Sequence, residues 1–157
     1  MSSTRNALSA FLVDTNVLVY AHDPRDTQKQ QRALDVLDRL IPRAEAVLSV
    51  QCLTEFFQAV RWKLAEPLAP EQALAQVERF ILACPVLDLT PMVVLEGCRG
   101  SNAHGLSLWD SLIWAAAKLN QVPCVLTENC DHGRTLEGVR FLNPFAPQFD
   151  IAHLEAG

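Results

Sequence analysis

Short apolar runs alternate along the chain with longer segments in which apolar residues recur every three or four positions. The short runs predict buried strands at residues 10–13, 46–49, 86–89, 124–127 and 139–142. The longer segments predict helices at residues 15–22, 27–41, 51–64, 70–83, 92–98 and 107–120. Strands that alternate with helices are typical of an α/β sandwich with a mostly parallel sheet. We expect one domain over residues 1–157.

Two segments carry more specific expectations. The helix at residues 92–98 should end near Gly100, because glycine commonly terminates a helix. The C-terminal stretch NPFAPQFDIAHL is apolar, so Phe145 and Phe149 should pack on the domain or on a partner.

Polar side chains follow two of the predicted strands. Asp14 stands where the first strand ends, and Thr127 ends a later strand, followed closely by Glu128, Asn129 and Asp131. In open α/β sheets, sites lie outside the carboxyl ends of the strands. These residues are therefore candidates for one site.

Two further acids interrupt apolar helices. Glu55 lies between Leu53 and Phe56, and Asp110 lies near the start of the most apolar helix. Buried carboxylates are costly unless they are paired, protonated or bound to metal. An Asp and Glu cluster suits hard cations such as Mg²⁺ or Mn²⁺, which prefer oxygen ligands.

Each acid also has a simpler interpretation. Asp14 can be the N-cap of the helix that follows it, and Asp110 can complete a capping box with Ser107. Glu55 can be a solvated helix residue, and Asp131 can belong to a turn. The metal interpretation rests on the common position of the acids near strand ends.

Composition narrows the classes of protein to which the chain can belong. The 157 residues carry a formal net charge of −5, which argues against broad, non-specific binding of polyanions. Five cysteines, an odd number without C-x-x-C spacing, favour free thiols in a reducing cytoplasm. No stretch approaches the roughly 20 apolar residues that span a membrane, so we expect no membrane association.

Four blocks of the chain resemble those of the PIN domain. They are DTNVLVYA at residues 14–21, SVQCLTEFF at 49–57, LSLWDSLIWAAA at 106–117 and LTENCDHG at 126–133. The ending EGVRFLNPF at 137–145 is similar to the tail of bacterial VapC-type toxins. The blocks occur in the family's order over almost the whole chain.

The resemblance implies a compact α/β/α domain and a Mg²⁺- or Mn²⁺-dependent endoribonuclease. It also implies the toxin of a type II toxin–antitoxin pair, commonly a homodimer that acts on RNA and is inhibited by a cognate antitoxin. By position, Asp14, Glu55 and Asp110 match the family's catalytic and metal-binding acids. Thr15, Asn16, Thr127 and Asn129 are expected to support the site.

The fourth block departs from the family pattern. Asn129 stands where the family has an aspartate. Asp131 or Glu128 could supply the missing charge, and we take Asp131 as the fourth candidate metal ligand. The departure keeps open a catalytically weak PIN-like module that binds proteins.

Two further interpretations remain open. A phosphotransfer domain with Asp14 as the covalent acceptor is weaker, because DTN lacks a second acid or a lysine beside it. The apolar faces of residues 27–41 and 51–64, with Trp62, could form a groove for an amphipathic partner or could fill the core.

Overall fold

The computed structural model describes residues 10–155 and places six strands in one sheet, in the order β3-β2-β1-β4-β6-β5. Every pairing is parallel except that of β5 with β6, which is antiparallel. The strands are β1 (Phe11–Val13), β2 (Ala46–Ser49), β3 (Val86–Leu87), β4 (Cys124–Leu126), β5 (Thr135–Leu136) and β6 (Val139–Leu142). The predicted α/β class with a mostly parallel sheet is confirmed. The expected domain of residues 1–157 extends at both ends beyond the described residues.

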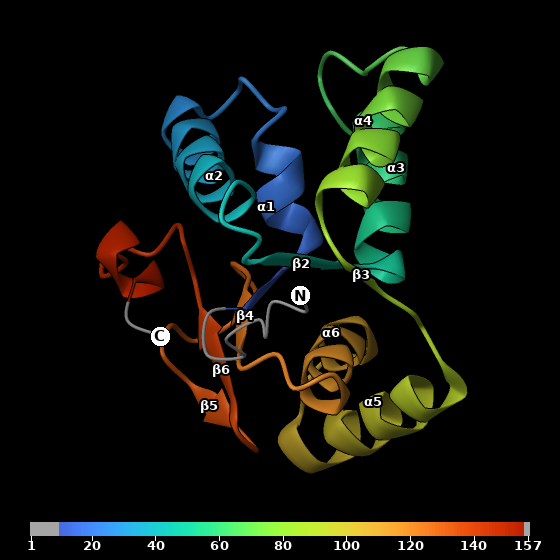
Figure 1. Ribbon diagram of the computed structural model, residues 1–157, viewed down its shortest axis with the longest axis vertical. Helices are drawn as coiled ribbons and strands as arrows, with labels where there is room; N and C mark the ends of the chain where they lie inside the picture. Colours follow the sequence, from blue (N-terminus) through green and yellow to red (C-terminus); the bar gives the residue numbers. More distant parts are fainter. Residues whose placement is uncertain (1–9, 156–157) are drawn as a thin grey trace, which may run out of the picture.

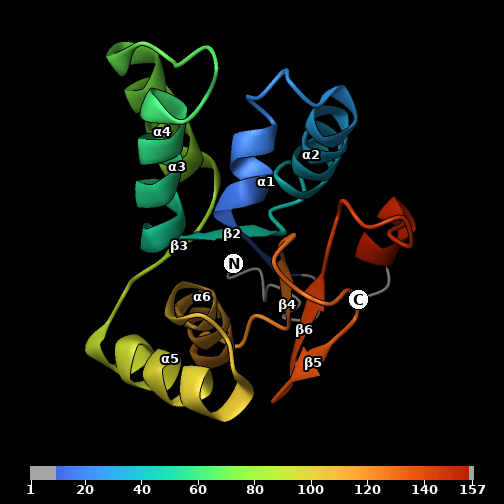
Figure 2. The same ribbon diagram turned by 180° about the vertical axis from the view of Figure 1, so that it is seen from behind.

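Helices cover both faces of this sheet (Figures 1 and 2). One layer holds α1 (Thr15–Tyr20), α2 (Thr27–Leu40), α3 (Val50–Trp62) and α4 (Pro70–Ala83). The opposite layer holds α5 (Pro91–His104) and α6 (Leu108–Leu119). A 3₁₀ turn, η2 (Ile151–Leu154), lies near the C-terminus. None of these helices is long and apolar enough to cross a membrane.

The alternation of side chains along the central strands creates two cores. Phe11 and Val13 pack into the core beneath α1–α4, whereas Leu12 between them packs into the core beneath α5 and α6. Successive residues of a strand point to opposite faces, so a central strand must be apolar throughout. Asp14 follows as the first polar residue of this run, at the carboxyl end of β1.

The prediction that the fifth helix ends near Gly100 is wrong, because α5 continues to His104. Gly105, in the left-handed conformation at φ 69°, ends it instead. A Cβ on Gly97 would lie 2.7 Å from Cδ2 of Leu112, and one on Gly100 would overlap the Trp114 ring. These two glycines allow α5 and α6 to approach closely, and they do not interrupt the helix.

The C-terminal segment packs on the domain. Phe149 is buried, and Phe145 meets Tyr20 edge to face with ring centroids 4.8 Å apart. All five cysteines are free thiols, as expected from their spacing.

Candidate active site

Asp14 lies at the carboxyl end of β1 and is only 6% exposed. Its Oδ1 accepts a hydrogen bond from the backbone N–H of Thr15 at 2.7 Å, so the residue is indeed the N-cap of α1. Its Oδ2 accepts a hydrogen bond from the hydroxyl of Thr127 at 2.8 Å. The capping role and a role in a site therefore coexist, because both oxygens keep lone pairs for another ligand.

Burial raises the pKa of Asp14 from 3.8 to about 6, since a charged carboxylate is poorly solvated there. The hydrogen bonds from Thr127 and Thr15 oppose this effect, and the negative charges of Asp110 and Glu55 add to it. A pKa shifted in this way is common among carboxylates at functional sites.

A hydrogen-bonded chain fixes the loop after β4 against α1. The Nδ2 of Asn16 donates to the Thr127 hydroxyl at 3.1 Å, and its Oδ1 accepts from the backbone N–H of Glu128 at 3.3 Å. The backbone N–H of Asn129 donates to the Thr127 hydroxyl at 3.1 Å. The predicted supporting residues Asn16, Thr127 and Asn129 are thus brought together around Asp14.

Glu55 is held in position from two sides. The Thr15 hydroxyl donates to its Oε2 at 3.0 Å, and the Nε2 of Gln51 donates to its Oε1 at 2.8 Å. The same Nε2 lies 3.2 Å from the carbonyl oxygen of Trp109, just before Asp110. Glu55 is therefore not a freely solvated helix residue, and Gln51 is a supporting residue that the sequence analysis missed. Its spacing of four residues from Glu55 on a helix was the available signal.

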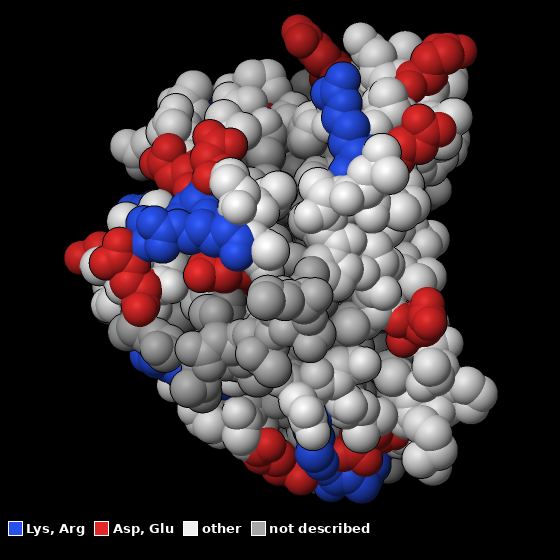
Figure 3. All heavy atoms as spheres, in the orientation of Figure 1, with Lys and Arg blue, Asp and Glu red and all other residues white. Residues whose placement is uncertain are grey.

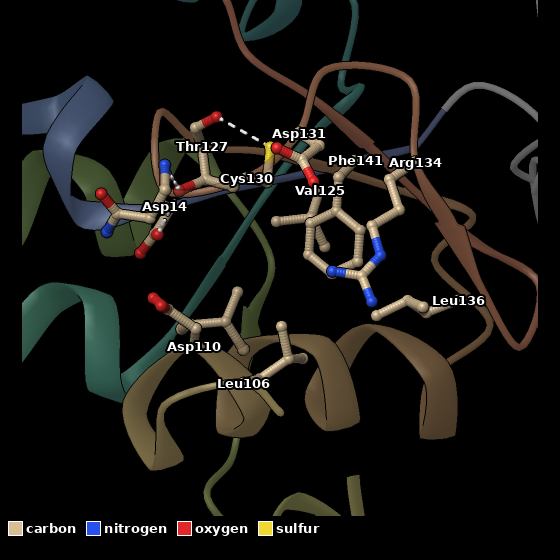
Figure 4. A pocket seen from close by; sticks show the side chains of 12 residues that line it. Asp14, Leu106, Asp110, Val125, Thr127, Cys130, Asp131, Arg134, Leu136 and Phe141 are labelled. Atoms are coloured by element: carbon tan, nitrogen blue, oxygen red, sulfur yellow. Dashed lines mark hydrogen bonds between the residues drawn. The ribbon is translucent and has the colours of Figure 1, made fainter. Parts of the chain in front are cut away.

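Asp110 occupies the first turn of α6, where its backbone N–H donates to the Ser107 hydroxyl at 3.2 Å. The positive end of the helix dipole lies at this turn. Its side chain points toward Asp14 across an open space (Figure 4).

Two hollows meet at these carboxylates. One is a cavity of about 350 Å³ between α6 and the loop that leads from β4 into β5 (Figure 4). The other is a groove of about 1,100 Å³ along α1 and α3. Asp14, Asp110 and Asn129 line both hollows, and Glu55 lines the groove. We call Asp14, Glu55 and Asp110 the acidic triad.

The acidic triad suits a divalent cation by its donor chemistry. Within residues 10–155, no three His, Cys, Asp or Glu side chains lie close enough to chelate one ion together. Magnesium keeps several waters and binds through one or two carboxylates, so it does not require such a group. Burial is the main cause of the raised pKa of Asp14, and the nearby charges of Asp110 and Glu55 add to it; a cation would neutralise this negative charge.

Glu128 and Asp131, the two candidates for the missing fourth acid, have different surroundings. Glu128 turns away from the cavity, because its Oε1 accepts from the Tyr20 hydroxyl at 2.6 Å and its Oε2 from Lys29 at 3.0 Å. Asp131 lines the 350 Å³ cavity together with Asp14 and Asp110. Its role as a metal ligand stays a prediction.

The groove is lined by α1 and α3, whereas the expected contribution of α2 is absent from its lining. Residues of α1 and α3 line it, Trp62 included, together with Trp109 from α6. The apolar residues of α2, by contrast, fill the core: Ala33, Val36, Leu37 and Leu40. The core interpretation is therefore right for residues 27–41. In residues 51–64, Phe56 and Val60 also fill the core, whereas Phe57 and Trp62 line the groove. A partner segment in this groove stays a prediction.

The surface carries no broad basic area on the face drawn in Figure 3, where blue and red side chains lie beside one another. This mixture agrees with the formal net charge of −5. Recognition of a phosphate backbone would have to be local on this face.

The sequence matches the family model described as the PIN domain over residues 11–136. The chain belongs to the PIN domain family. Asp14, Glu55, Asp110 and Thr127 all fall within the matched residues. No curated protein sequence matches the chain.

Solved structures with the same PIN fold come from toxin–antitoxin systems. DNA-bound VapBC from Salmonella typhimurium is 22% identical with a TM-score of 0.60, covering 84% of this chain and 96% of that one. A toxin–antitoxin complex from Klebsiella pneumoniae is 15% identical with a TM-score of 0.64, covering 87% and 98%. VapC20 of Mycobacterium tuberculosis, described as a toxin that cleaves the sarcin–ricin loop, is 15% identical with a TM-score of 0.57, covering 74% and 87%. At these identities the likeness shows the fold alone.

Proposed function

We propose that this PIN domain is a metal-dependent endoribonuclease and the toxin of a type II toxin–antitoxin pair. The observation that carries the proposal is the meeting of the acidic triad at the junction of the groove and the cavity. Its distribution over β1, α3 and α6 means that three distant parts of the sequence supply one site. Structural neighbours from toxin–antitoxin systems support the biological class.

Asp14, Asp110 and Glu55 would together hold Mg²⁺ or Mn²⁺, some of them through the waters that such an ion keeps. Such an ion, when bound, supplies an acidified water and neutralises charge on a phosphate. Thr127 and the backbone N–H of Thr15 keep Asp14 in one orientation and favour its charged form. Thr15 and Gln51 orient Glu55. The groove beside the triad offers a path for the RNA chain.

The proposal extends to partners. A cognate antitoxin, as in the VapBC complexes of similar fold, would bind and inhibit the enzyme, and two copies of the chain would form a homodimer. The alternative of a catalytically weak, protein-binding PIN module is favoured by one observation, the neutral Asn129 beside Asp14.

Cleavage of a mixed RNA pool by the purified protein tests the proposal, with Mg²⁺, with Mn²⁺ and with EDTA. We expect cleavage only with metal, and its loss in Asp14→Asn and Asp110→Asn. Asp88→Asn serves as the matched control, because Asp88 is exposed and lines neither hollow. Calorimetric titration of Mn²⁺ should show weaker binding in the two site variants and unchanged binding in the control. Normal metal binding without any RNA cleavage would instead support the binding module.

A further inference from the structure

The 350 Å³ cavity beside the acidic triad has, besides its polar residues, an apolar part that metal chemistry does not need. Ile113, Val125, Leu136 and Phe141 line it, contributed by α6, β4, β5 and β6. Its volume lies at the lower end of the range for small-molecule sites, about 300–1,000 Å³. The cavity thus combines apolar and polar walls and opens at the proposed phosphodiester site. Such a cavity suits a flat ring with apolar faces and polar edges that is attached to the phosphate chain.

Two opposite charges stand at the rim of the cavity without neutralising each other. Arg134 and Asp131 both line it, and both side chains reach toward its interior (Figure 4). The backbone N–H of Arg134 donates to the carbonyl oxygen of Asp131 at 3.0 Å, so one turn carries both. Within the described residues, their side chains form no ion pair with each other or with another side chain. A free cation and a free anion at the rim of one cavity can contact different polar groups of one ring.

The wall that carries Arg134 is held firmly. The backbone N–H of Phe141 donates to the carbonyl oxygen of Arg134 at 2.8 Å, and the indole N–H of Trp114 donates to that of Leu136 at 3.1 Å. At the tip of the β5–β6 hairpin, Glu137 pairs with Arg99 at 2.8 Å and with Lys118 at 3.3 Å. The hairpin is thereby fixed against α5 and α6, and the cavity is preformed.

We propose that this cavity binds one nucleobase of the RNA next to the cleaved bond, and that the base is guanine. The inference rests on the proposed function and names the substrate feature that the site selects. Guanine offers the acceptors O6 and N7 on one edge, which an arginine contacts in a bidentate manner. Its other edge offers N–H donors, which the carboxylate of Asp131 can accept. Adenine places an N–H₂ donor where Arg134 needs an acceptor, so Arg134 disfavours it.

Cleavage of RNA with a randomised segment tests the proposal, with each cut mapped by sequencing the new 5′ ends. We expect guanine at one fixed position relative to the cut. Arg134→Gln should lower this guanine preference by roughly ten- to a hundredfold while cleavage persists at other bases. Arg140→Gln is the matched control, because Arg140 is exposed on the same hairpin and lines neither hollow.

Asp131→Asn separates base recognition from metal binding. We expect it to lower the guanine preference at the cut site, an effect that loss of a metal ligand alone would not produce. Weaker Mn²⁺ binding with an unchanged cut position would make Asp131 a metal ligand and overturn its proposed role. An unchanged cut position in Arg134→Gln would overturn the guanine site itself. If that variant loses only antitoxin binding, the cavity belongs to the protein partner.

Free nucleosides provide a test that does not depend on cleavage. NMR titration of the wild-type protein with guanosine and with adenosine should shift resonances of residues around the cavity, more strongly with guanosine. The shifts should disappear in Arg134→Gln and persist in Arg140→Gln.

If the wild type cleaves no RNA, the proposed function fails, yet guanosine binding still supports the base site. Absence of guanosine binding together with random cut positions would overturn the proposed base site. Binding of guanosine with random cut positions would assign the cavity to a free nucleotide and overturn the RNA assignment.

Discussion

The hydroxyl of Thr127 donates a hydrogen bond to Oδ2 of Asp14 at 2.8 Å, joining the carboxyl ends of β4 and β1. The bond lowers the pKa of a carboxyl group that burial raises to about 6. Without it, Asp14 would be protonated over more of the neutral range. A residue 113 positions away in the sequence thus helps to decide whether Asp14 carries a charge.

Thr127→Val should therefore move the acidic limb of the activity profile to higher pH, by about one unit, which corresponds to the net energy of one hydrogen bond. The physical reason is that valine has the same shape but cannot donate to Asp14. The measurement is the pH dependence of RNA cleavage at a fixed, subsaturating Mn²⁺ concentration, where the metal-free carboxyl group titrates. Thr127→Ser, which keeps the hydroxyl, should retain the wild-type midpoint. An unchanged midpoint in the valine variant would mean that Asp14 does not set the acidic limb.

Asp14→Asn should stabilise the metal-free protein at neutral pH. The folded pKa of about 6 lies above the ordinary value of 3.8, so the folded state binds protons more tightly than the unfolded state. The free energy of unfolding of the wild type therefore falls as pH rises from about 4 to about 6, and this loss amounts to roughly 3 kcal/mol.

The Asp14→Asn variant lacks this pH dependence. The difference between its free energy of unfolding and that of the wild type should therefore be small at pH 4 and largest above pH 6. Urea denaturation in EDTA across this range measures it, with Asp88→Asn as the exposed control. Equal stability of wild type and Asp14→Asn at pH 8 would show that burial of the charge costs nothing.

Glu55→Gln should weaken metal binding without removing the site, because Thr15 and Gln51 can still hold the side chain. We expect the Mn²⁺ concentration for half-maximal cleavage to rise about tenfold, equivalent to about 1.4 kcal/mol. Excess Mn²⁺ should restore much of the rate. Glu66→Gln, an exposed change in the loop after α3, is the control. If the Glu55 variant behaves as the wild type at every metal concentration, Glu55 has no part in metal binding.

Asn129→Asp should tighten divalent-metal binding. Asn129 lines both hollows beside Asp14, and a carboxylate is a stronger ligand than an amide for a hard cation. We expect the calorimetric dissociation constant for Mn²⁺ to fall about tenfold, again equivalent to about 1.4 kcal/mol. Asn102→Asp places the same charge on the exposed side of α5 and should change nothing. Equal affinities in both variants would place Asn129 outside the metal site.

Gly100→Ala should destabilise the fold by about 1–3 kcal/mol, despite the better helix propensity of alanine. The added methyl group would overlap the buried Trp114 ring. Urea denaturation measures the change, and Cys98→Ala, at an exposed position of the same helix, is the control. A more stable Gly100→Ala protein would show that α5 and α6 can separate at little cost.

The sequence by itself determined the order of the strands and helices, apart from the two-residue strand β5 and the 3₁₀ turn η2, which it did not predict. It also determined the position of Asp14 and Thr127 at strand ends. These features depend on the local alternation of apolar and polar side chains, which can be read from consecutive residues. The resemblance of four blocks to the PIN domain then pointed to the acidic triad. The family match confirms the resemblance, and the role of the triad stays a prediction.

Tertiary structure decided the properties that depend on partners far along the chain. Gly100 looked like a helix end, but its role follows from its contact with Trp114. Glu128 looked like a spare acid for the site, but Lys29 and Tyr20 bind its carboxylate, which does not line the cavity. Arg134 gave no signal in the sequence, because its importance lies only in the cavity that β4, β5, β6 and α6 enclose. The chain's local pattern sets where an acid stands, whereas packing sets which groups surround it and therefore its charge.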